Sequence, residues 1–293
     1  MWYTKDFDDY ELLDCSDGER LERWKDIILV RPDPQVIWKN AKRHPAWKKY
    51  NARYIRSSKG GGAWDIKNLS GDELNVGWNI KRNGLTFYVR PTGFKHTGVF
   101  PEQACNWDFI DSKIRSAGRP ISVLNLFGYT GIASIAAANA GASVCHVDAS
   151  MGIVAWCKEN AALSGLKDAP IRYIVDDCKK FIEREIRRGH KYDAIIMDPP
   201  SYGRGPGGEI WKLEDDVDSL IALTSELISE NPLFVIINSY TTGLSASTVG
   251  YIAKLHYADK FGGKVTSDEI GIPVTTTGAV LPAGSSTRWE MYE

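Results

Sequence analysis

A short apolar run, Ala194–Met197, ends in Asp198-Pro199-Pro200-Ser201-Tyr202, and this pair of segments restricts the possible folds more than any other part of the chain. Four consecutive apolar residues predict a strand that is buried on both faces, as in a parallel sheet. The two prolines end the strand, because proline has a fixed φ and no backbone N–H. Asp198 is therefore expected at the carboxyl end of a central strand, where open α/β sheets bind their ligands. A simple strand-ending turn is the alternative interpretation.

Three other segments show the same order of an apolar strand followed by polar or glycine residues. They are Ser122–Leu126 followed by Phe127-Gly128-Tyr129-Thr130-Gly131, Ser143–Val147 followed by Asp148, and Ile171–Val175 followed by Asp176-Asp177. The small residues of Ile132–Ala140 predict a helix that ends at Gly141. Any one of the acids could be a solvated loop residue. Their recurrence at the ends of successive strands predicts βαβ units with a ligand at one edge of the sheet.

The glycine turn before this helix has a specific chemical use. Glycine allows the backbone to approach a ligand closely, and the first turn of a helix has free N–H groups. The spacing Gly128-x-x-Gly131 is not the GxGxxG dinucleotide fingerprint, which argues against a nicotinamide oxidoreductase. Asp148 follows the turn by about 20 residues, where an acid can bind a ribose diol.

Together these segments resemble the class I S-adenosylmethionine-dependent methyltransferases, and within them the bacterial 23S rRNA methyltransferase-like group of cytosine-C5 and guanine-N7 enzymes. The resemblance extends from about Phe94 to the C-terminus. It rests on Phe94-Lys-His-Thr97-Gly98-Val99-Phe100-Pro-Glu-Gln103, Asn125–Gly131, Asp148-Ala149-Ser150, Asp176-Asp177 and Asp198–Tyr202. The resemblance implies an α/β fold with a Rossmann-like, mostly parallel sheet of seven strands that includes one antiparallel insertion.

The resemblance also implies S-adenosylmethionine as the cofactor and a set of residues that bind it. That set is Thr97, Gly98, Val99, Asn125, Phe127, Gly128, Tyr129, Thr130, Gly131, Asp148, Ala149, Ser150, Asp176, Asp177 and Cys178. Within it, Asp148 would bind the ribose, and Asp177 and Cys178 would lie beside the adenine. The implied catalytic residues are Asp198, Pro199 and Tyr202. Asp198 and the Pro199 carbonyl would hold the edge of a target base, and Tyr202 would stack on its face. Such a base must be flipped out or single-stranded.

The chain departs from the resemblance in its cysteines. Cytosine-C5 enzymes need a cysteine thiolate that attacks the pyrimidine ring, usually after the fourth or fifth strand, and no cysteine follows Cys178. A nitrogen or oxygen acceptor needs no covalent intermediate, so we expect one of these. The small N-terminal RNA-binding domain of many relatives is also not recognisable in the sequence.

The charge is unevenly distributed. Residues 1–118 contain 20 Lys and Arg against 16 Asp and Glu, whereas residues 119–293 contain 16 against 21. Residues 36–60 contain eight Lys and Arg, no acid, and two tryptophans and two tyrosines. Cations neutralise phosphates and aromatic rings stack on unpaired bases, which predicts an RNA contact. The expected substrate-binding residues are Lys42, Arg43, Lys48, Lys49 and Arg204. A solvated amphipathic segment whose tryptophans pack on the core is the alternative.

The chain is predicted to divide near residue 92. Residues 1–92 would form a small β-rich domain with a possible RNA contact, and residues 93–293 the methyltransferase domain. Alternating apolar residues around Asn83-Gly84 predict a hairpin. Other predicted elements are strands at 26–31, 233–237, 264–273 and 287–292, a helix that ends at Gly118, and helices near 151–164, 178–189 and 212–230. Gly203–Gly208 is predicted to be either a flexible lid, with Arg204 near a phosphate, or a plain linker.

Several classes of protein are disfavoured by composition. The N-terminus lacks the apolar core of a signal peptide, and no apolar run approaches membrane-spanning length. Five scattered cysteines and five histidines have no metal-ligand spacing. We therefore expect a cytoplasmic protein with reduced thiols, no metal and no membrane partner. The expected partner is RNA, with ribosomal RNA the first candidate. A methyltransferase of a small molecule or protein and a non-catalytic cofactor-binding module remain open, and the sequence indicates no oligomeric state.

Overall fold

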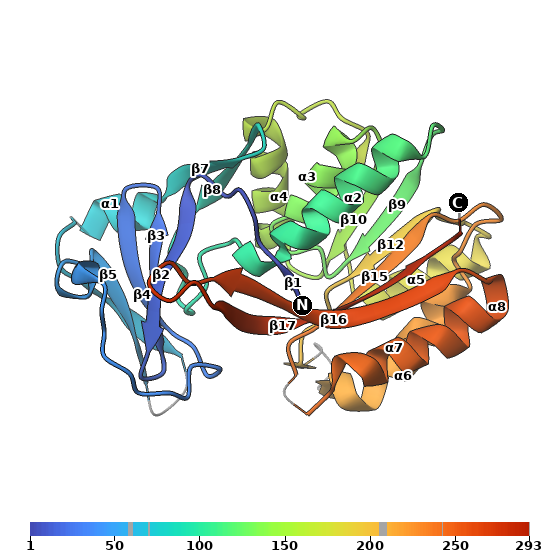
Figure 1. The fold of residues 1–293 in the computed structure, drawn as a ribbon. Coiled ribbons are helices and arrows are strands. Elements are labelled where there is room, and N and C mark those ends of the chain that lie inside the picture. The colour runs from blue at the N-terminus through green and yellow to red at the C-terminus, as the bar shows by residue number, and fades with distance from the viewer. Residues whose placement is uncertain (58–60, 70, 205–209, 242, 293) are drawn as a thin grey trace.

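A computed structural model describes the chain except residues 58–60, 70, 205–209, 242 and 293, and except the side chains of residues 71–73 and 204. Figure 1 shows a large sheet with helices on both faces and a smaller group of strands, in blue, beside it. The predicted methyltransferase-like α/β fold with a β-rich N-terminal part is confirmed.

The large sheet has the order β1-β16-β17-β15-β12-β9-β10-β11. Its strands are β1 (Trp2–Tyr3), β9 (Ser122–Leu126), β10 (Ser143–Asp148), β11 (Ile171–Val175), β12 (Ala194–Met197), β15 (Phe234–Ser239), β16 (Lys264–Pro273) and β17 (Val280–Glu290). Only β17 is antiparallel to its neighbours, β15 and β16. The seven expected strands are all present with the one antiparallel insertion, and β1 adds an eighth that runs parallel to β16.

Helices cover the sheet on both faces (Figure 1). The helices are α2 (Ala104–Ser116), α3 (Ile132–Asn139), α4 (Met151–Leu163), α5 (Cys178–Arg187), α6 (Leu213–Ser225), α7 (Ala246–Ala253), a π-helical turn (Lys254–Ala258) and α8 (Asp259–Phe261). Successive residues of β12 point to opposite faces. Ile196 packs in the core that includes α2 and α3, and Ile195 and Met197 pack in the core that includes α5, α6 and α7. This double burial explains the apolar run of β12.

Two parts of the large sheet region differ from the prediction. β17 begins at Val280, earlier than the predicted start at residue 287, because its first residues pair with β16 although Pro282 and Gly284 are typical of loops. The helical segment between residues 246 and 261 was not predicted. Its packing against β16 and β17 places it on the sheet.

The N-terminal sheet has five strands in the order in which they occur in the chain. They are β2 (Tyr10–Ser16), β3 (Glu19–Trp24), β4 (Ile27–Pro32), β5 (Ala52–Arg56) and β6 (Gly62–Ile66). The strand expected at 26–31 corresponds to β4, and the other four were not predicted individually. Short helices complete this part: the 3-10 helix η1 (Pro45–Lys48) and α1 (Gly71–Val76), with the 3-10 helix η2 (Pro101–Gln103) just before α2.

The predicted hairpin is present as β7 (Trp78–Arg82) and β8 (Leu85–Val89). Asn83 and Gly84 both have positive φ, 49° and 77°, as a two-residue type I′ turn requires. The hairpin is bound to α4, because the Tyr88 amide donates to Asn160 Oδ1 at 2.8 Å and Trp156 Nε1 donates to the Tyr88 carbonyl at 3.0 Å. Since this hairpin packs on α4 and β1 belongs to the large sheet, the division near residue 92 remains a prediction.

The segment after β12 forms a small ribbon of β13 (Tyr202–Arg204) and β14 (Ile210–Lys212). Residues 205–208 of the predicted lid, and the side chain of Arg204, lie outside the described part of the chain. None of the described helices is long and apolar enough to cross a membrane.

Candidate active site

The turn between β9 and α3 has an unusual backbone. Phe127 and Tyr129 have positive φ values of 56° and 49°, and Gly131 has 84°. Positive φ at residues other than glycine is uncommon and clusters at ligand sites. A Cβ atom at Gly131 would lie 1.9 Å from Cys157 Sγ, and one at Gly128 would lie 2.4 Å from the ring of His146. Only glycine therefore allows this turn to pack closely against α4 and β10.

Asp148 ends β10 next to this turn. Its Oδ2 accepts the Tyr129 amide at 3.0 Å and its Oδ1 accepts the Ser150 amide at 2.9 Å. Burial raises the pKa of Asp148, although the two amide hydrogen bonds act in the opposite direction. The carboxylate is thus fixed in place with lone pairs left for a pair of ligand hydroxyls.

The end of β11 contributes the next part of the site. Asp177 caps α5 by accepting the Lys180 amide at 2.9 Å, and Cys178 Sγ accepts the Phe127 amide at 3.3 Å. Asp177 and Cys178 face the same cavity as Asp148. Asp176, in contrast, forms an ion pair with Arg184.

The segment before α2 supports the glycine turn. Thr130 Oγ1 donates to the Gly98 carbonyl at 2.5 Å. Gly98 has a φ of 97°, and a Cβ atom there would lie 2.4 Å from the Trp156 ring. Thr97 Oγ1 is buried and has no hydrogen-bonding partner among the described residues, and Val99 packs in the core.

These elements surround a cavity of about 610 Å³. Its lining combines the carboxyl ends of the large sheet with the N-terminal sheet: Arg20, Asp33, Pro34, Gln35, Lys95, His96, Phe100, Glu102, Phe127, Tyr129, Asp148, Ala149, Asp177, Cys178, Asp198, Pro199, Pro200, Ser201, Tyr240 and Ala283. A narrow recess of about 50 Å³ shares Phe100, Phe127, Tyr129 and Asp198 with it. The site therefore extends from the glycine turn to the end of β12.

The predicted cofactor-binding and catalytic residues fall into three groups. Those lining the larger cavity are Phe127, Tyr129, Asp148, Ala149, Asp177, Cys178, Asp198 and Pro199. Those lining the recess include Gly98, Asn125, Gly128, Thr130 and Gly131. Those lining neither are Thr97, Val99, Ser150, Asp176 and Tyr202. The structure thus brings most of the predicted set together.

Asp198 stands at the end of β12, as its position in the sequence predicts. Its Oδ1 is buried and finds no hydrogen-bonding partner in the part of the chain that the structure describes. Burial, with repulsion from Glu102, raises the pKa of Asp198 to about 7. A buried acceptor without a partner is costly in a folded protein and is expected where a ligand supplies the donor.

The ring that the sequence analysis expected to stack on the base is not in the cavity lining, whereas other aromatic rings are. Tyr202 is 51% exposed and lies in β13, outside the cavity lining. Phe100 and Tyr240 line the cavity, with ring centroids 6.1 Å apart. Gln103 Nε2 donates to the Tyr240 hydroxyl at 2.7 Å and orients it. The position of Tyr240 directly after β15, which ends at Ser239, is the sequence feature that could have indicated its place in the cavity.

Two of the cations of the basic segment 36–60, and one of its tryptophans, are engaged by the N-terminal sheet. Glu19 binds both Lys42, at 2.8 Å, and Arg53, at 2.7 Å. Trp47 Nε1 donates to Asp14 Oδ2 at 2.8 Å, and Lys42 lies over the Trp47 ring. The expected contacts Lys42, Arg43, Lys48 and Lys49 do not line the cavity. The packing of its aromatic residues supports the structural alternative, and an RNA contact remains a prediction.

Among the described residues, no group of three or more His, Cys, Asp or Glu side chains is arranged to hold a metal ion.

Comparison with known proteins agrees with this geometry. Residues 37–261 match the family model described as S-adenosylmethionine-dependent methyltransferase. The crystal structure of the SAM-dependent methyltransferase from Agrobacterium tumefaciens is 37% identical, covers 99% of this chain and 93% of that one, and has a TM-score of 0.92. SMU.776, a proposed methyltransferase solved in complex with SAH, is 22% identical with a TM-score of 0.72 over 97% of this chain and 76% of its own, which shows the fold alone.

A curated relative matches a shorter region. The ribosomal RNA large subunit methyltransferase K/L of Shewanella frigidimarina (strain NCIMB 400) is 32% identical over 170 residues, which is 57% of this chain. The match spans only 23% of the relative's length.

Proposed function

The chain belongs to the S-adenosylmethionine-dependent methyltransferase family, and we propose that it methylates a nitrogen or oxygen atom of a base in RNA, with ribosomal RNA as the first candidate. When bound, the cofactor of the family would supply a methyl group on a sulfonium sulfur: a nucleophilic atom of the substrate would bond to the methyl carbon, and the sulfur would leave as the neutral thioether S-adenosylhomocysteine. The observation that supports a base as substrate most strongly is the buried, unpartnered Oδ1 of Asp198, in the same cavity as Asp148.

The residues present fit this cofactor. Asp148, oriented by two backbone amides, has free lone pairs for the ribose hydroxyls. Phe127 and Cys178 provide an apolar surface beside it for the adenine, and Asp177 lies within reach of the same surface. The glycine turn 127–131 would face the methionine end. These roles are proposals derived from the positions of the side chains.

Asp198 is suited to hold the methyl acceptor. Its ionised carboxylate would accept a hydrogen bond from an N–H of the base, and the carbonyl of Pro199 would accept a second. A nitrogen that gains a methyl group must lose a proton, and a carboxylate with a pKa of about 7 can receive it. Holding donor and acceptor in line supplies up to about 7–11 kcal/mol of the barrier in well-oriented reactions.

The aromatic rings would fix the plane of the base. Phe100 and Tyr240 lie in the cavity with Asp198, and we propose that one of them stacks on the base. Tyr202, exposed in β13, would contact the substrate at the rim. A base in a duplex cannot enter such a cavity, so the target would be flipped out or single-stranded.

RNA as the substrate class is supported by the rRNA methyltransferase relatives and by the exposed cations Arg43, Lys48 and Lys49. Five cysteines without disulfides accord with a reaction in the reducing cytoplasm. A small-molecule methyltransferase is the second candidate. It is favoured by the pairing of Lys42 and Arg53 with Glu19, which reduces the charge available to a polyanion.

Mass spectrometry of rRNA nucleosides from cells with and without the gene tests the proposal. We expect one methylated nucleoside, modified at nitrogen or oxygen, to be missing without the gene and restored by the wild-type gene but not by Asp198→Ala. Unchanged nucleosides would favour the small-molecule alternative. RNA containing 5-fluorocytosine should form no denaturant-stable adduct with the protein, and a 5-methylcytosine product or a trapped adduct would contradict nitrogen or oxygen transfer.

A further inference from the structure

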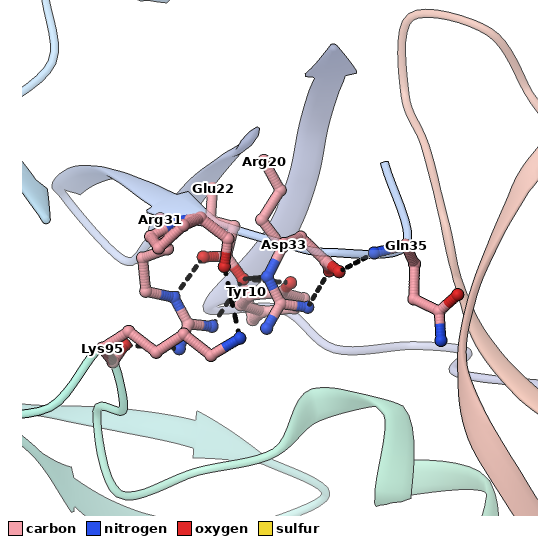
Figure 2. A network of polar contacts seen from close by, with 8 residues as sticks. Tyr10, Arg20, Glu22, Arg31, Asp33, Gln35 and Lys95 are labelled. Atoms are coloured by element: carbon pink, nitrogen blue, oxygen red, sulfur yellow. Dashed lines mark hydrogen bonds and ion pairs between the residues drawn. The ribbon is translucent and has the colours of Figure 1, made fainter. Parts of the chain in front are cut away.

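One wall of the cavity is formed by Arg20 of β3, a residue of the N-terminal sheet that no sequence motif marks (Figure 2). Its side chain is only 7% exposed. The contacts to Glu22 and Asp33, at 3.5 and 3.6 Å, are ion pairs without a hydrogen bond of normal length. Arg20 Nε is buried and has no hydrogen-bonding partner among the described residues. Arg20 therefore lines the cavity as a buried guanidinium whose N–H donors are not satisfied by hydrogen bonds of normal length.

The acids beside Arg20 are already occupied by other donors. Glu22 accepts two hydrogen bonds from Arg31, at 2.5 and 2.8 Å, and one from the Tyr10 hydroxyl at 2.8 Å. Asp33 Oδ1 accepts the Gln35 amide at 2.9 Å. Glu22 and Asp33 thus keep Arg20 charged and in position, through Nε and Nη1 respectively. These two contacts are too long to satisfy the five N–H groups of a guanidinium, which leaves donors for a ligand. Leaving such donors unpaired in a buried site costs free energy, which points to a ligand.

A second cation lies on the same wall. Lys95 lines the cavity, and its Nζ donates to the Pro32 carbonyl at 3.3 Å. Burial, together with repulsion from Arg20, lowers the pKa of Lys95 to about 8. The pKa of the neighbouring His96 is lowered to about 4 by burial and by the cations Arg31 and Lys95. Burial is the larger cause of both shifts, and the neighbouring cations add to it. The acids Glu22, Glu102 and Asp33 act in the opposite direction on Arg20, whose pKa they raise.

Two acidic residues, Asp33 and Glu102, line the cavity beside Arg20 and Lys95. Burial raises the pKa of Glu102, although Arg20 opposes this shift. Asp33 lines the cavity and is 6% exposed. Asp33 is engaged by Arg20 and by the Gln35 amide. Glu102 Oε2 and His96 Nδ1 are also buried without a hydrogen-bonding partner among the described residues. The cationic donors on this wall are those of Arg20 and Lys95.

We propose that Arg20 and Lys95 form a phosphate-binding site for the substrate, in the cavity that also contains Asp198. A guanidinium donates two parallel hydrogen bonds to a phosphate, and an ammonium adds a point charge. Arg20 and Lys95 are not among the residues proposed for the cofactor, most of which come from the ends of β9, β10 and β11, although both sets line the same cavity. This proposal rests on the proposed function in one respect, namely that the substrate occupies this cavity. The phosphate could belong to an RNA backbone or to the end of a small molecule.

The test compares nucleoside 5′-monophosphates with the corresponding nucleosides by calorimetry, in the presence of S-adenosylhomocysteine. Charge-assisted hydrogen bonds are strong enough that wild-type protein should bind at least one monophosphate about tenfold or more tightly than its nucleoside. Arg20→Gln should abolish this preference. Arg20→Lys, which keeps the positive charge but loses the two parallel N–H donors of the guanidinium, should retain part of it. Arg53→Gln removes a cation from the same sheet outside the cavity and should retain all of it.

Three results would overturn the proposal: no phosphate preference in the wild-type protein, an unchanged preference in Arg20→Gln, or a loss of S-adenosylhomocysteine affinity in that variant. Circular dichroism melting shows whether Arg20→Gln folds, and Lys95→Gln, expected to weaken the preference, gives a second measurement if it does not. Trinucleotides that bind more tightly than monophosphates through Arg20 would identify a backbone phosphate, and equal binding a terminal one. RNA methylation is measured in a separate assay. A protein that does not methylate RNA can still prefer the monophosphate, so failure of the proposed function and failure of the phosphate site give different results.

Discussion

The backbone amide of Tyr129 donates a 3.0 Å hydrogen bond to Oδ2 of Asp148, which joins the turn after β9 to the end of β10. The amide of Ser150 holds Oδ1 at 2.9 Å. Two parallel strands thus cooperate to orient one carboxylate before any ligand arrives. Preorganisation of this kind reduces the entropy lost on binding.

Replacing Asp148 by Ala should weaken S-adenosylmethionine binding by about tenfold or more, because a charge-assisted hydrogen bond contributes about 1.5–3 kcal/mol. Isothermal titration calorimetry measures the effect. Asp111→Asn is a matched control, because Asp111 is paired with Arg115 on the surface of α2. A folded Asp148→Ala protein with wild-type affinity would remove this residue from the cofactor site.

Replacing Gly131 by Ala should destabilise the protein by about 2 kcal/mol or more, because positive φ strain adds to overpacking against Cys157. We also expect cofactor affinity to fall, since the turn must move away from α4. The control is Gly141→Ala, at φ 103° with open space around the new Cβ, where only the backbone strain applies. Urea unfolding that finds equal losses at the two positions would contradict the packing argument.

The Asp198→Asn substitution should stabilise the protein in a pH-dependent way. The pKa of this carboxyl is about 7 in the folded protein against about 3.8 as its ordinary value. Between these values the folded state binds more protons, so stability falls as pH rises and the penalty is complete above pH 7. The gain in melting temperature from Asp198→Asn should therefore be larger at pH 8 than at pH 4, while methyl transfer is lost. An equal gain at both pH values would contradict the shifted pKa.

If residues 36–60 bind RNA, the exposed pair Lys48 and Lys49 should account for more of the salt dependence than Lys42. Each phosphate contact on a single strand contributes roughly −0.7 to the log–log slope of affinity against salt. Replacing Lys48 and Lys49 by Gln should therefore flatten the slope, and Lys42→Gln should change it less, because Glu19 already binds Lys42 at 2.8 Å. RNA binding titrated at several salt concentrations distinguishes the variants, and identical slopes would make the segment structural.

Much of the large sheet was predictable from local sequence. β9, β10, β12 and β15 are buried on both faces, so each is an apolar run that residue hydrophobicity reveals. The acids Asp148 and Asp198 follow these runs directly and were therefore placed correctly at strand ends. The first half of β17 was not predictable, because Pro282 and Gly284 resemble a loop and only pairing with β16 makes them a strand.

Local sequence was enough to predict the order of strands and helices, the glycine turn and the acids at the strand ends, because these depend on residues near one another in the chain. Which side chains meet across the cavity depends on the folded chain as a whole. The tertiary structure brought Arg20 and Lys95 to the cavity of Asp198, placed Tyr240 there in place of Tyr202, and paired Lys42 with Glu19. Such contacts join residues far apart in the chain, and no local periodicity or motif encodes the distance between them.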